Sequence, residues 1–491
     1  MLLGTVGWFW YASLVPSTYS VMDMGYADYG GGPAGTAGMA GMDGMDGGSH
    51  VGHDMSGVSV ADLTGPVDGT PDLAVTLTAR QGEVRLASGE RVSGYTLNGR
   101  TPGPRLEATQ GDLVQVRLRN QDVGGGVTLH WHGVDVPNAE DGVAGVTQDA
   151  VPVGGSHVYR FVVPDAGTYW YHSHQVSHEQ VRGGLFGTLV VHPADAAADA
   201  STSPDVLAVV HTYDGRRTVN GRTEVSRVEV PGGSTTRVRV VNTDSGAARV
   251  WVSAAPYRIL AVDGHDIEGG TDVVGKVVLV PAGGRVDLAV DVPMTGTRVD
   301  VGGGTALVLG PRGGRVVAEP EPQVEVDLLD YGRSTADLPF DPQRADRRFD
   351  YDIGRRIGFL DGRPGFWWTI NGHQFPDVPM YVVDEGDVVV MTIRNDSGDS
   401  HPMHLHGHHA MVLSRDGVES SGAQWWVDSL QVEGGETYEI AFVADNPGIW
   451  MDHCHNLPHA AEGLVAHLAY NGVREPFVVG REVGDAHNQP E

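Results

Sequence analysis

Hydrophobic and polar residues alternate in many short, Val-rich runs along this chain, whereas apolar stripes with helical spacing are scarce. The clearest runs are DLVQVRLRN (112–120), STTRVRVVN (234–242) and DVVVMTIRN (387–395). Alternation with a period of two is typical of strands that bury one face. The pattern therefore predicts an all-β protein.

Each of these runs closes one copy of an internal repeat. A copy begins at an Asn-Gly pair and ends at an Asn, with intervals of 22, 22 and 24 residues: Asn98 to Asn120, Asn220 to Asn242 and Asn371 to Asn395. Asn-Gly favours tight hairpin turns, and short alternating strands between such turns are typical of β-sandwiches. We expect three tandem Greek-key sandwiches at residues 73–195, 200–325 and 345–475, with a tail at 476–491.

Length and composition agree with this division. The chain has 491 residues, of which 40% are hydrophobic and 70 are glycine, which is enough for about three turn-rich domains. The net charge of −30 excludes a general nucleic-acid binder, whose phosphate contacts require a basic surface. It also favours solubility and the attraction of cations.

The N-terminal region, residues 1–72, has two unusual parts. Residues 3–16 are apolar and uncharged but fewer than the roughly 20 that span a bilayer, and no positive charge precedes them. We favour an exported protein, either tethered to the outer face of the cell membrane or secreted; a signal-peptide remnant or a partly buried segment is the alternative. Residues 20–72 are low in complexity, which predicts disorder.

Methionines are concentrated in this region, with seven of the 13 in the first 55 residues. Thioether and imidazole groups there could capture copper(I) weakly, because thioether sulfur is a soft ligand. The candidates are Met39, Met42, Met45, His50, His53 and Met55. A flexible spacer with no metal role explains the segment equally well.

The only cysteine, Cys454, lies between His453 and His455, with His459 shortly after. A single cysteine forms no intramolecular disulfide. A thiolate with two imidazoles is the ligand set of a blue-copper electron-transfer site. This tripeptide therefore predicts a metal site.

Three further clusters share the His-x-His pattern. With His459 included, the four clusters hold ten of the 22 histidines. On a strand, residues i and i+2 point to one face, so each pair can direct two imidazoles to one metal or to adjacent metals. The clusters are His130-Trp131-His132, His172-Ser173-His174 and the run from His401 through His404 to His406.

The clusters follow the repeat. The segment ending at His172-Ser173-His174 aligns with the one ending at His453-Cys454-His455, and the corresponding middle segment, GGRVDLAVDVPMTGTRVDVGG, has no His or Cys. We therefore expect the first and third sandwiches to hold metals at their interface. The second sandwich serves as spacer and wall.

From about Tyr95 to Tyr470 the chain resembles the multicopper oxidases, the family of laccases, cuprous oxidases and ferroxidases. The resemblance rests on HWHG, HSH, HPMHLHGH and HCHNLPHAAEGL, which occur in the family's order. It implies a cupredoxin-like fold for each sandwich, and four coppers per chain: one of type 1, one of type 2 and two of type 3.

The same resemblance implies the role of each ligand. Cys454, His401 and His459 would hold the type 1 copper, and the axial position is Leu464, which cannot ligate and so raises the potential. The trinuclear site would use His130 and His404 for type 2. It would use six histidines for the type 3 pair: His132, His172, His174, His406, His453 and His455.

The implied activity is the four-electron reduction of dioxygen to water. Electrons would enter near His459 or His401 and pass from Cys454 to its two histidine neighbours. By resemblance Asp141 is a proton donor, and the alternative is an ordinary Asp-Gly turn. The residue after His459, acidic in many relatives, is Ala460 here, and no second proton donor is assigned.

The expected enzyme is a copper-dependent oxidoreductase of laccase type that oxidises phenols or aromatic amines, because Leu464 favours a high potential. The alternative is a metal oxidase, cuprous or ferrous, acting in copper tolerance. A copper-storage protein and a copper nitrite reductase rank lower. The expected partners are dioxygen and a small reducing substrate, with a monomeric chain. Trp425 and Trp426 would wall the substrate pocket or pack in the core, and Asp428 would belong to the same wall or accept a substrate proton.

Overall fold

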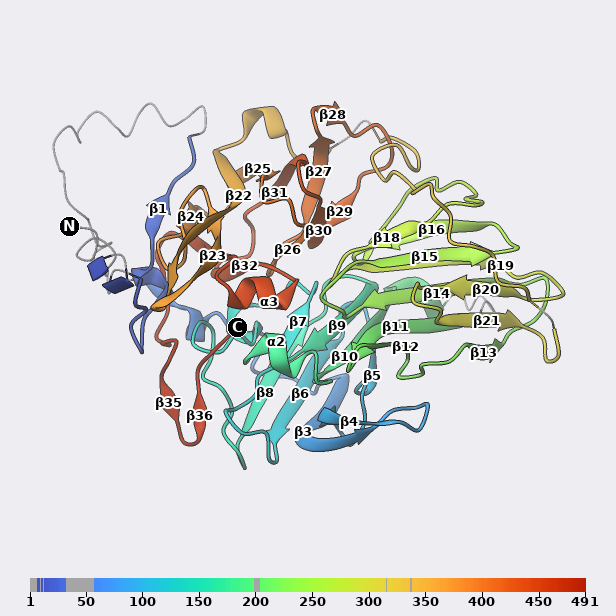
Figure 1. Ribbon diagram of the computed structural model, residues 1–491, viewed down its shortest axis with the longest axis horizontal. Coiled ribbons are helices and arrows are strands. Elements are labelled where there is room, and N and C mark those ends of the chain that lie inside the picture. Colours follow the sequence, from blue (N-terminus) through green and yellow to red (C-terminus); the bar gives the residue numbers. More distant parts are fainter. Residues whose placement is uncertain are drawn as a thin grey trace.

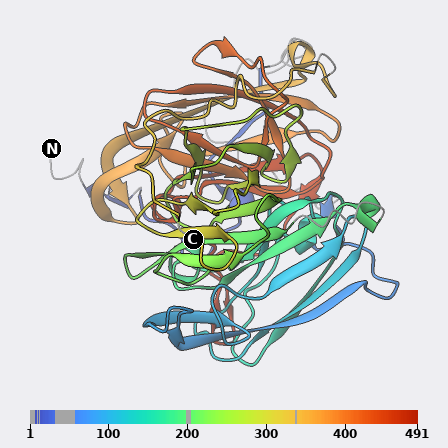
Figure 2. The same cartoon turned by 90° about the vertical axis from the view of Figure 1, so that its right-hand side faces the viewer.

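The computed structural model describes residues 7–8, 10–11, 13–31, 57–197, 204–314, 316–335 and 338–491. The predicted all-β class is confirmed, since strands form nearly all of the regular structure. Figure 1 shows the first sandwich at the bottom in blue and cyan, the second at the right in green and yellow, and the third at the upper left in orange and red. In the view of Figure 2 the third sandwich again lies above the first.

The first sandwich consists of two four-stranded sheets. One sheet has the order β4 (Arg91–Leu97), β3 (Leu73–Arg85), β6 (Leu113–Asn120) and β8 (Ser156–Val162). The other has the order β5 (Arg105–Thr109), β10 (Phe186–His192), β9 (Gly167–His172) and β7 (His130–His132).

The second sandwich repeats this plan with added edge strands. Its first sheet has the order β12 (Arg216–Val219), β11 (Asp205–Tyr213), β14 (Thr235–Asn242), β19 (Arg285–Asp291), β16 (Tyr257–Val262) and β17 (His265–Asp266). Its second has the order β13 (Ser226–Glu229), β21 (Ala306–Gly310), β20 (Thr297–Asp300), β15 (Ala248–Ser253) and β18 (Val278–Val280).

The third sandwich has the largest sheets. One has the order β23 (Arg363–Ile370), β22 (Arg347–Leu360), β25 (Val388–Asn395), β31 (Thr437–Val443), β27 (Ala410–Arg415) and β28 (Val418–Glu419), with β29 (Trp426–Val427) also on β27. The other has the order β1 (Tyr26–Asp28), β24 (Pro379–Val383), β33 (Val465–Tyr470), β32 (Ile449–Cys454), β26 (His401–Leu405) and β30 (Ser429–Val432).

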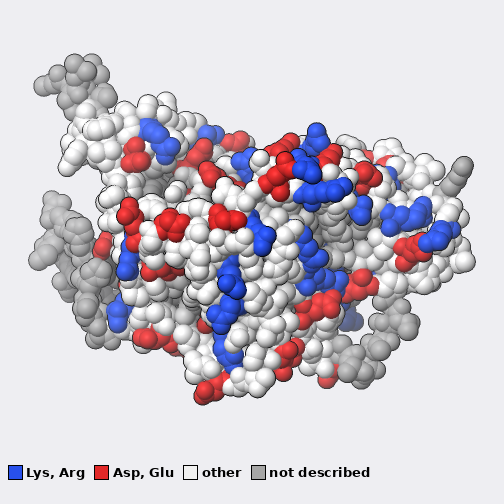
Figure 3. Space-filling view, turned by 90° about the horizontal axis from the view of Figure 1, so that it is seen from below, with Lys and Arg blue, Asp and Glu red and all other residues white. Residues whose placement is uncertain are grey.

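Helices are few and short in the described residues. Two α-helices lie wholly within the described residues, α2 (Ser177–Gln180) and α3 (Leu457–Ala461), and residues 7–8 and 10–11 are also helical; no helix in the described part of the chain is long and apolar enough to cross a bilayer. The 3-10 helices are η1 (Val21–Asp23), η2 (Val60–Asp62), η3 (Asn138–Glu140), η4 (Ala194–Ala197) and η5 (Pro342–Arg344). On the face in Figure 3, basic side chains form a narrow row near the middle, and acidic side chains lie on both sides of it.

The Asn-Gly repeat has a single physical cause. Asn98, Asn220 and Asn371 all adopt left-handed φ values of 53° to 54°, which Asn tolerates better than most residues. Each side chain also binds the neighbouring strand: the amide of Asn371 donates to Asp350 O and its Oδ1 accepts from Asp352 N, both at 2.8 Å. The other two asparagines make the equivalent pair of bonds, with Thr76 and Thr78 and with Leu207 and Val209.

The sheets bring the histidine clusters together in pairs. In the first sandwich β7 lies beside β9, with His130 opposite His172. In the third, β26 lies beside β32, with His404 opposite His453. The equivalent strands of the second sandwich, β15 and β20, carry no His or Cys, which agrees with its predicted role as a spacer.

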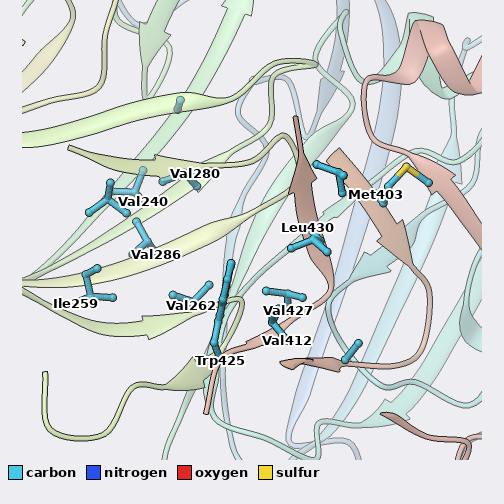
Figure 4. Close-up of a cluster of buried hydrophobic side chains, with 14 of the residues drawn as sticks. Val240, Ile259, Val262, Val280, Val286, Met403, Val412, Trp425, Val427 and Leu430 are labelled. Atoms are coloured by element: carbon cyan, nitrogen blue, oxygen red, sulfur yellow. The ribbon is translucent and has the colours of Figure 1, made fainter. Parts of the chain in front are cut away.

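The second and third sandwiches share one continuous hydrophobic cluster. Figure 4 shows Trp425 between Val262 of the second sandwich and Val427 of the third. Trp425 is only 8% exposed, which confirms core packing for this residue.

The prediction of disorder for residues 20–72 is wrong for the parts that the structure describes. β1 pairs in parallel with β24, and β2 (Val58–Ser59) pairs with β34 (Val473–Arg474). Val21 and Val60 are buried in a cluster with residues of the third sandwich. The segment adds a strand to an otherwise open sheet edge and so satisfies its backbone groups. The methionines and histidines at 39–55 lie outside the described residues.

The tail at 476–491 returns to the first sandwich. It forms a hairpin of β35 (Glu482–Val483) and β36 (Ala486–His487), and Gly125 forms a bridge with Ala486. The end of the chain lies beside α2 and α3, where the first and third sandwiches meet (Figure 1).

Candidate metal centre

The structure brings all eleven predicted metal-ligating residues together. Their donor atoms fall into several groups, and within each group these atoms lie within 4.8 Å of one another. The groups draw their residues from the first and third sandwiches. One group is His401, Cys454 and His459, and three more consist of histidines alone: His130, His132 and His404; His132, His172 and His455; and His174, His406 and His453. A fifth group joins Asp141 to His130 and His406.

In the cysteine group three donor atoms face one point. Cys454 Sγ lies 3.5 Å from His401 Nδ1 and 3.8 Å from His459 Nδ1, and the two nitrogens are 3.2 Å apart. The outward-facing Nε2 atoms have other partners, Ser397 Oγ at 2.8 Å for His401 and the Asn456 side chain at 3.0 Å for His459. These contacts fix both rings with Nδ1 turned inward.

The cysteine group is set in apolar surroundings. Leu464 is fully buried, and its carbonyl oxygen accepts a hydrogen bond of 3.1 Å from the Cys454 amide. Burial raises the pKa of the Cys454 thiol above its usual range. A thiolate in this position therefore needs a bound cation as its partner.

Only one of the two imidazoles in this group reaches the surface. His401 is fully buried and His459 is partly exposed. The prediction that electrons could enter from the surface at His401 is therefore wrong. The Trp368 ring lies 4.4 Å from the His459 ring and donates through Nε1 to Glu462 at 3.0 Å. Arg355 lies over the same indole, with its guanidinium carbon 4.1 Å from the ring centroid.

The remaining eight histidines form a continuous buried group. His130 Nε2 lies 3.4 Å from His404 Nε2, and His406 Nε2 lies 3.3 Å from His453 Nε2. Burial lowers the pKa of His132 and of His453 to about 3, and lowers the pKa of most of the others well below 6.5. The imidazoles with lowered pKa values are thus neutral, which is the form that binds metals.

Several ring nitrogens in this group have no hydrogen-bond partner although they are buried. They are His132 Nδ1, His172 Nε2, His453 Nδ1 and both ring nitrogens of His174 and His455. Buried polar atoms in native proteins are nearly always paired, so unpaired lone pairs converging on shared points fit metal ions. Neutral imidazoles together with one thiolate suit copper.

Asp141 lies between the two sandwiches at this group. Its Oδ1 is 3.0 Å from His130 Nδ1 and 3.1 Å from His406 Nδ1, so both rings have Nε2 turned toward the centre. Burial raises the pKa of Asp141. Gly142 follows with a φ of 79°, so the Asp-Gly turn is present as well.

Asp428 was missed as a residue of this centre. Its Oδ1 lies 3.1 Å from His132 Nε2, and its carbonyl oxygen accepts from His404 Nδ1 at 2.8 Å. Burial would raise its pKa, but the Arg285 guanidinium holds the pKa of Asp428 well below its usual range. The interpretation of Asp428 as part of a substrate pocket is wrong, because its side chain is fully buried.

Glu491, in the segment assigned only as a tail, was also missed. Its Oε1 lies 2.9 Å from His453 Nδ1 and 3.7 Å from His174 Nε2. Neither Asp428 nor Glu491 belongs to a local motif, and both reach the histidines from distant parts of the sequence.

Comparisons with known proteins agree with this geometry. A family model described as multicopper oxidase matches residues 78–196, and a second with the same description matches residues 351–472. Multicopper oxidase MmcO of Mycobacterium tuberculosis is 27% identical over 84% of this chain and 90% of its own length.

Two solved structures extend this likeness to the fold. A multi-copper oxidase from Pseudomonas thermotolerans is 28% identical, covers 81% of this chain and 98% of its own, and gives a TM-score of 0.66. Lac15, from a marine microbial metagenome, is 30% identical, covers 80% of this chain and 99% of its own, and gives a TM-score of 0.58.

Proposed function

The chain belongs to the multicopper oxidase family, and we propose that it is a laccase-type member that oxidises phenols or aromatic amines. As a member of this family it is a copper-dependent oxidoreductase that uses dioxygen. The observation that carries the proposal is the position of Cys454, whose thiol faces His401 and His459 while its chain neighbours face the histidine group.

We assign four coppers to the chain. Cys454, His401 and His459 hold one, and His130 with His404 hold a second. The triads His132, His172, His455 and His174, His406, His453 hold the other pair. Bound in these positions, copper supplies one-electron oxidation of the substrate and four-electron reduction of dioxygen to water.

The protein contributes orientation, exclusion of water and a proton donor. Asp141 fixes the His130 and His406 rings through their Nδ1 atoms and is the assigned source of protons, since it is the carboxyl group bonded to both rings. Asp428 does the same for His132 through Nε2, which leaves His132 Nδ1 free for a metal. One peptide link on each side joins Cys454 to His453 and His455.

The reducing substrate is assigned to the exposed edge of His459. Trp368 is fully buried and supports the His459 ring from beneath, and the partly exposed Glu462 supplies a carboxylate that can accept a phenol or amine proton. Leu464 offers no sulfur donor, which favours Cu(I) and a high potential. Laccase-1 of Botryotinia fuckeliana, 27% identical, is a relative with this type of name.

Oxygen uptake with 2,6-dimethoxyphenol by the copper-loaded protein tests the proposal. We expect turnover that is lost in Cys454→Ser, which keeps all ten histidines of the centre. Absence of uptake with the phenol, combined with rapid uptake on Fe(II) or Cu(I), would reject the laccase assignment while leaving the oxidase class intact.

The second candidate is a metal oxidase. A relative named iron transport multicopper oxidase fetC, from Epichloe festucae, is 25% identical over 75% of this chain. Deletion of residues 32–56, which contain the Met/His cluster, should then depress Cu(I) oxidation and leave phenol oxidation unchanged. Equal rates of Cu(I) oxidation before and after the deletion would show that the segment does not collect copper(I) for the enzyme.

Export from the cytoplasm is a further part of the proposal. It is supported by the apolar stretch at residues 3–16. Fractionation of cells that express the full chain tests it, and recovery of the oxidase activity only in the cytoplasm would reject export.

A further inference from the structure

The last residues of the chain are firmly attached to the loop that follows His174. The amides of Val176 and Ser177 donate to the carbonyl oxygens of Gln489 and Pro490, at 2.6 and 3.3 Å. Gln175 binds on both sides: its Oε1 accepts from the Gln489 amide at 2.9 Å and its Nε2 donates to His487 O at 2.6 Å. The tail is thus attached directly beside a predicted metal ligand.

A buried asparagine holds the same tail from the other side. Asn488 is fully buried; its Oδ1 accepts from the Ala150 amide and its Nδ2 donates to Asp149, both at 2.8 Å. A buried, fully bonded side chain of this kind fixes one position for the tail.

The loop that binds the tail contains one residue with a strained backbone conformation. Val176 has a φ of 45°, in the left-handed region that β-branched residues rarely occupy. In this conformation its amide points to Gln489 O. Strain of this kind persists only where surrounding contacts enforce it, and it is concentrated at functional sites.

These attachments place the Glu491 side chain against the histidine group. The side chain is only 9% exposed, and Ser177 Oγ donates to its Oε2. Its Oε1 lies 2.9 Å from His453 Nδ1 and 3.7 Å from His174 Nε2 without forming an aligned hydrogen bond to either, so this buried oxygen has no partner. It is directed into the space between two rings of one triad.

A carboxylate on the outer nitrogen of a ligating histidine is a recurrent feature of metal sites, since it fixes the tautomer and the ring orientation. His453 turns Nε2 toward His406 Nε2, at 3.3 Å, and so leaves Nδ1 to carry the proton. Glu491 Oε1 is the acceptor nearest to that nitrogen.

Glu491 also forms part of a wall. It lines a cavity of about 190 Å³ together with Gln489, Pro490, His467 and residues of the N-terminal segment such as Tyr19. Because the same side chain contacts His453, it stands between this cavity and the triad. The helix α3 offers no carboxyl group at Ala460, so the tail is the source of an acidic side chain here.

We propose that Glu491 is a positioning residue of the trinuclear site, delivered by the tail to orient His453 and His174 and to close their side of the site. The inference rests on the proposed copper assignment of these histidines. It makes the tail a component of the metal centre rather than a free extension.

The test compares copper-loaded wild type with Glu491→Ala, Glu491→Gln and the control Glu482→Gln, an exposed glutamate of the same tail. Copper retention against a chelator is measured alongside the absorption and EPR spectra of each site. In Glu491→Ala we expect copper to be held about 10- to 100-fold more weakly at the trinuclear site. The type 3 signature should change while the Cys454 band does not.

Glu491→Gln should retain part of the effect, because its amide oxygen can still accept from His453 Nδ1, and it covers the case in which the alanine variant fails to fold. Glu482→Gln should match wild type. Unchanged copper retention and an unchanged type 3 signature in both Glu491 variants would overturn the inference. Absence of any type 3 signature in wild type would instead reject the proposed copper assignment itself.

Discussion

Arg285 of the second sandwich donates through both terminal nitrogens to Asp428 of the third, at 2.6 and 2.5 Å, and both side chains are fully buried. The same carboxylate lies 3.1 Å from His132 Nε2 of the first sandwich. One ion pair therefore joins all three sandwiches at the metal centre. The second sandwich, which has no ligands in the described residues, contributes the cation that keeps Asp428 ionised.

The first prediction is that Arg285→Leu destabilises the protein by about 3–5 kcal/mol, because it leaves the buried Asp428 carboxylate without its cation. Urea unfolding of the copper-free protein measures the loss. The control is Arg312→Leu, which removes an exposed pair with Glu229 worth about 0–1 kcal/mol. Equal losses of unfolding free energy in the two variants would show that the buried Arg285–Asp428 pair stabilises the protein no more than an exposed pair does.

The second prediction concerns Leu464. In Leu464→Met a thioether becomes available beside Cys454, which favours Cu(II) and should lower the potential of the cysteine site and the rate with phenols. The exchange conserves volume and should cost less than about 1.5 kcal/mol of stability. Redox titration of the blue band provides the measurement, with the buried Leu468→Met as control. A potential that is unchanged or raised would contradict the prediction.

The sequence predicted the parts of the centre that depend on local chemistry. Period-two alternation and Asn-Gly turns are local signals, so the three sandwiches and the eleven converging residues could be found from spacing and resemblance. Arg285, Asp428 and Glu491 have no such pattern. Asp428 meets His132 across 296 residues and Glu491 meets Ser177 across 314, and only the packing of the sandwiches and the tail creates these contacts.

The N-terminal segment illustrates the opposite error. Its Gly-rich composition predicted disorder. A few apolar residues such as Val21 are nevertheless enough to order the described part of the segment, because its backbone pairs with an available sheet edge. Composition describes the average character of a segment, whereas strand addition depends on a partner elsewhere in the chain.

The third prediction concerns the proposed substrate surface. In Trp368→Ala the buried indole that packs on the His459 ring and binds Glu462 is removed, so both groups at the proposed substrate surface lose their support. The value of kcat/KM for a phenol should fall by up to about tenfold, since aromatic contacts contribute about 0.5–1.5 kcal/mol. The blue absorption of the Cys454 site should persist. Steady-state kinetics measure the change. Trp367→Ala is the matched control, because its side chain points to the opposite face of β23. A larger loss of kcat/KM in Trp367→Ala than in Trp368→Ala would indicate that the substrate binds on the Trp367 face of β23 instead.

The last prediction concerns attachment of the N-terminal segment. Glu475 accepts hydrogen bonds from Ser20 Oγ and from the Val21 amide, and burial raises its pKa from 4.5 to about 8. The folded protein therefore binds this proton more tightly than the unfolded chain does. By linkage, the contribution of Glu475 to stability is fully present below pH 4.5 and is lost as the pH rises through about 8.

Comparison of wild type with Glu475→Gln isolates this effect, because the amide has no proton to lose. The difference in unfolding free energy, wild type minus variant, should fall as the pH is raised from 4.5 to 8, by an amount on the order of a few kcal/mol. Thermal unfolding of both proteins across this range measures it. A difference that stays constant with pH would show that Glu475 is ionised while the segment is bound, in which case the Ser20 and Val21 donors outweigh the cost of burying the charge.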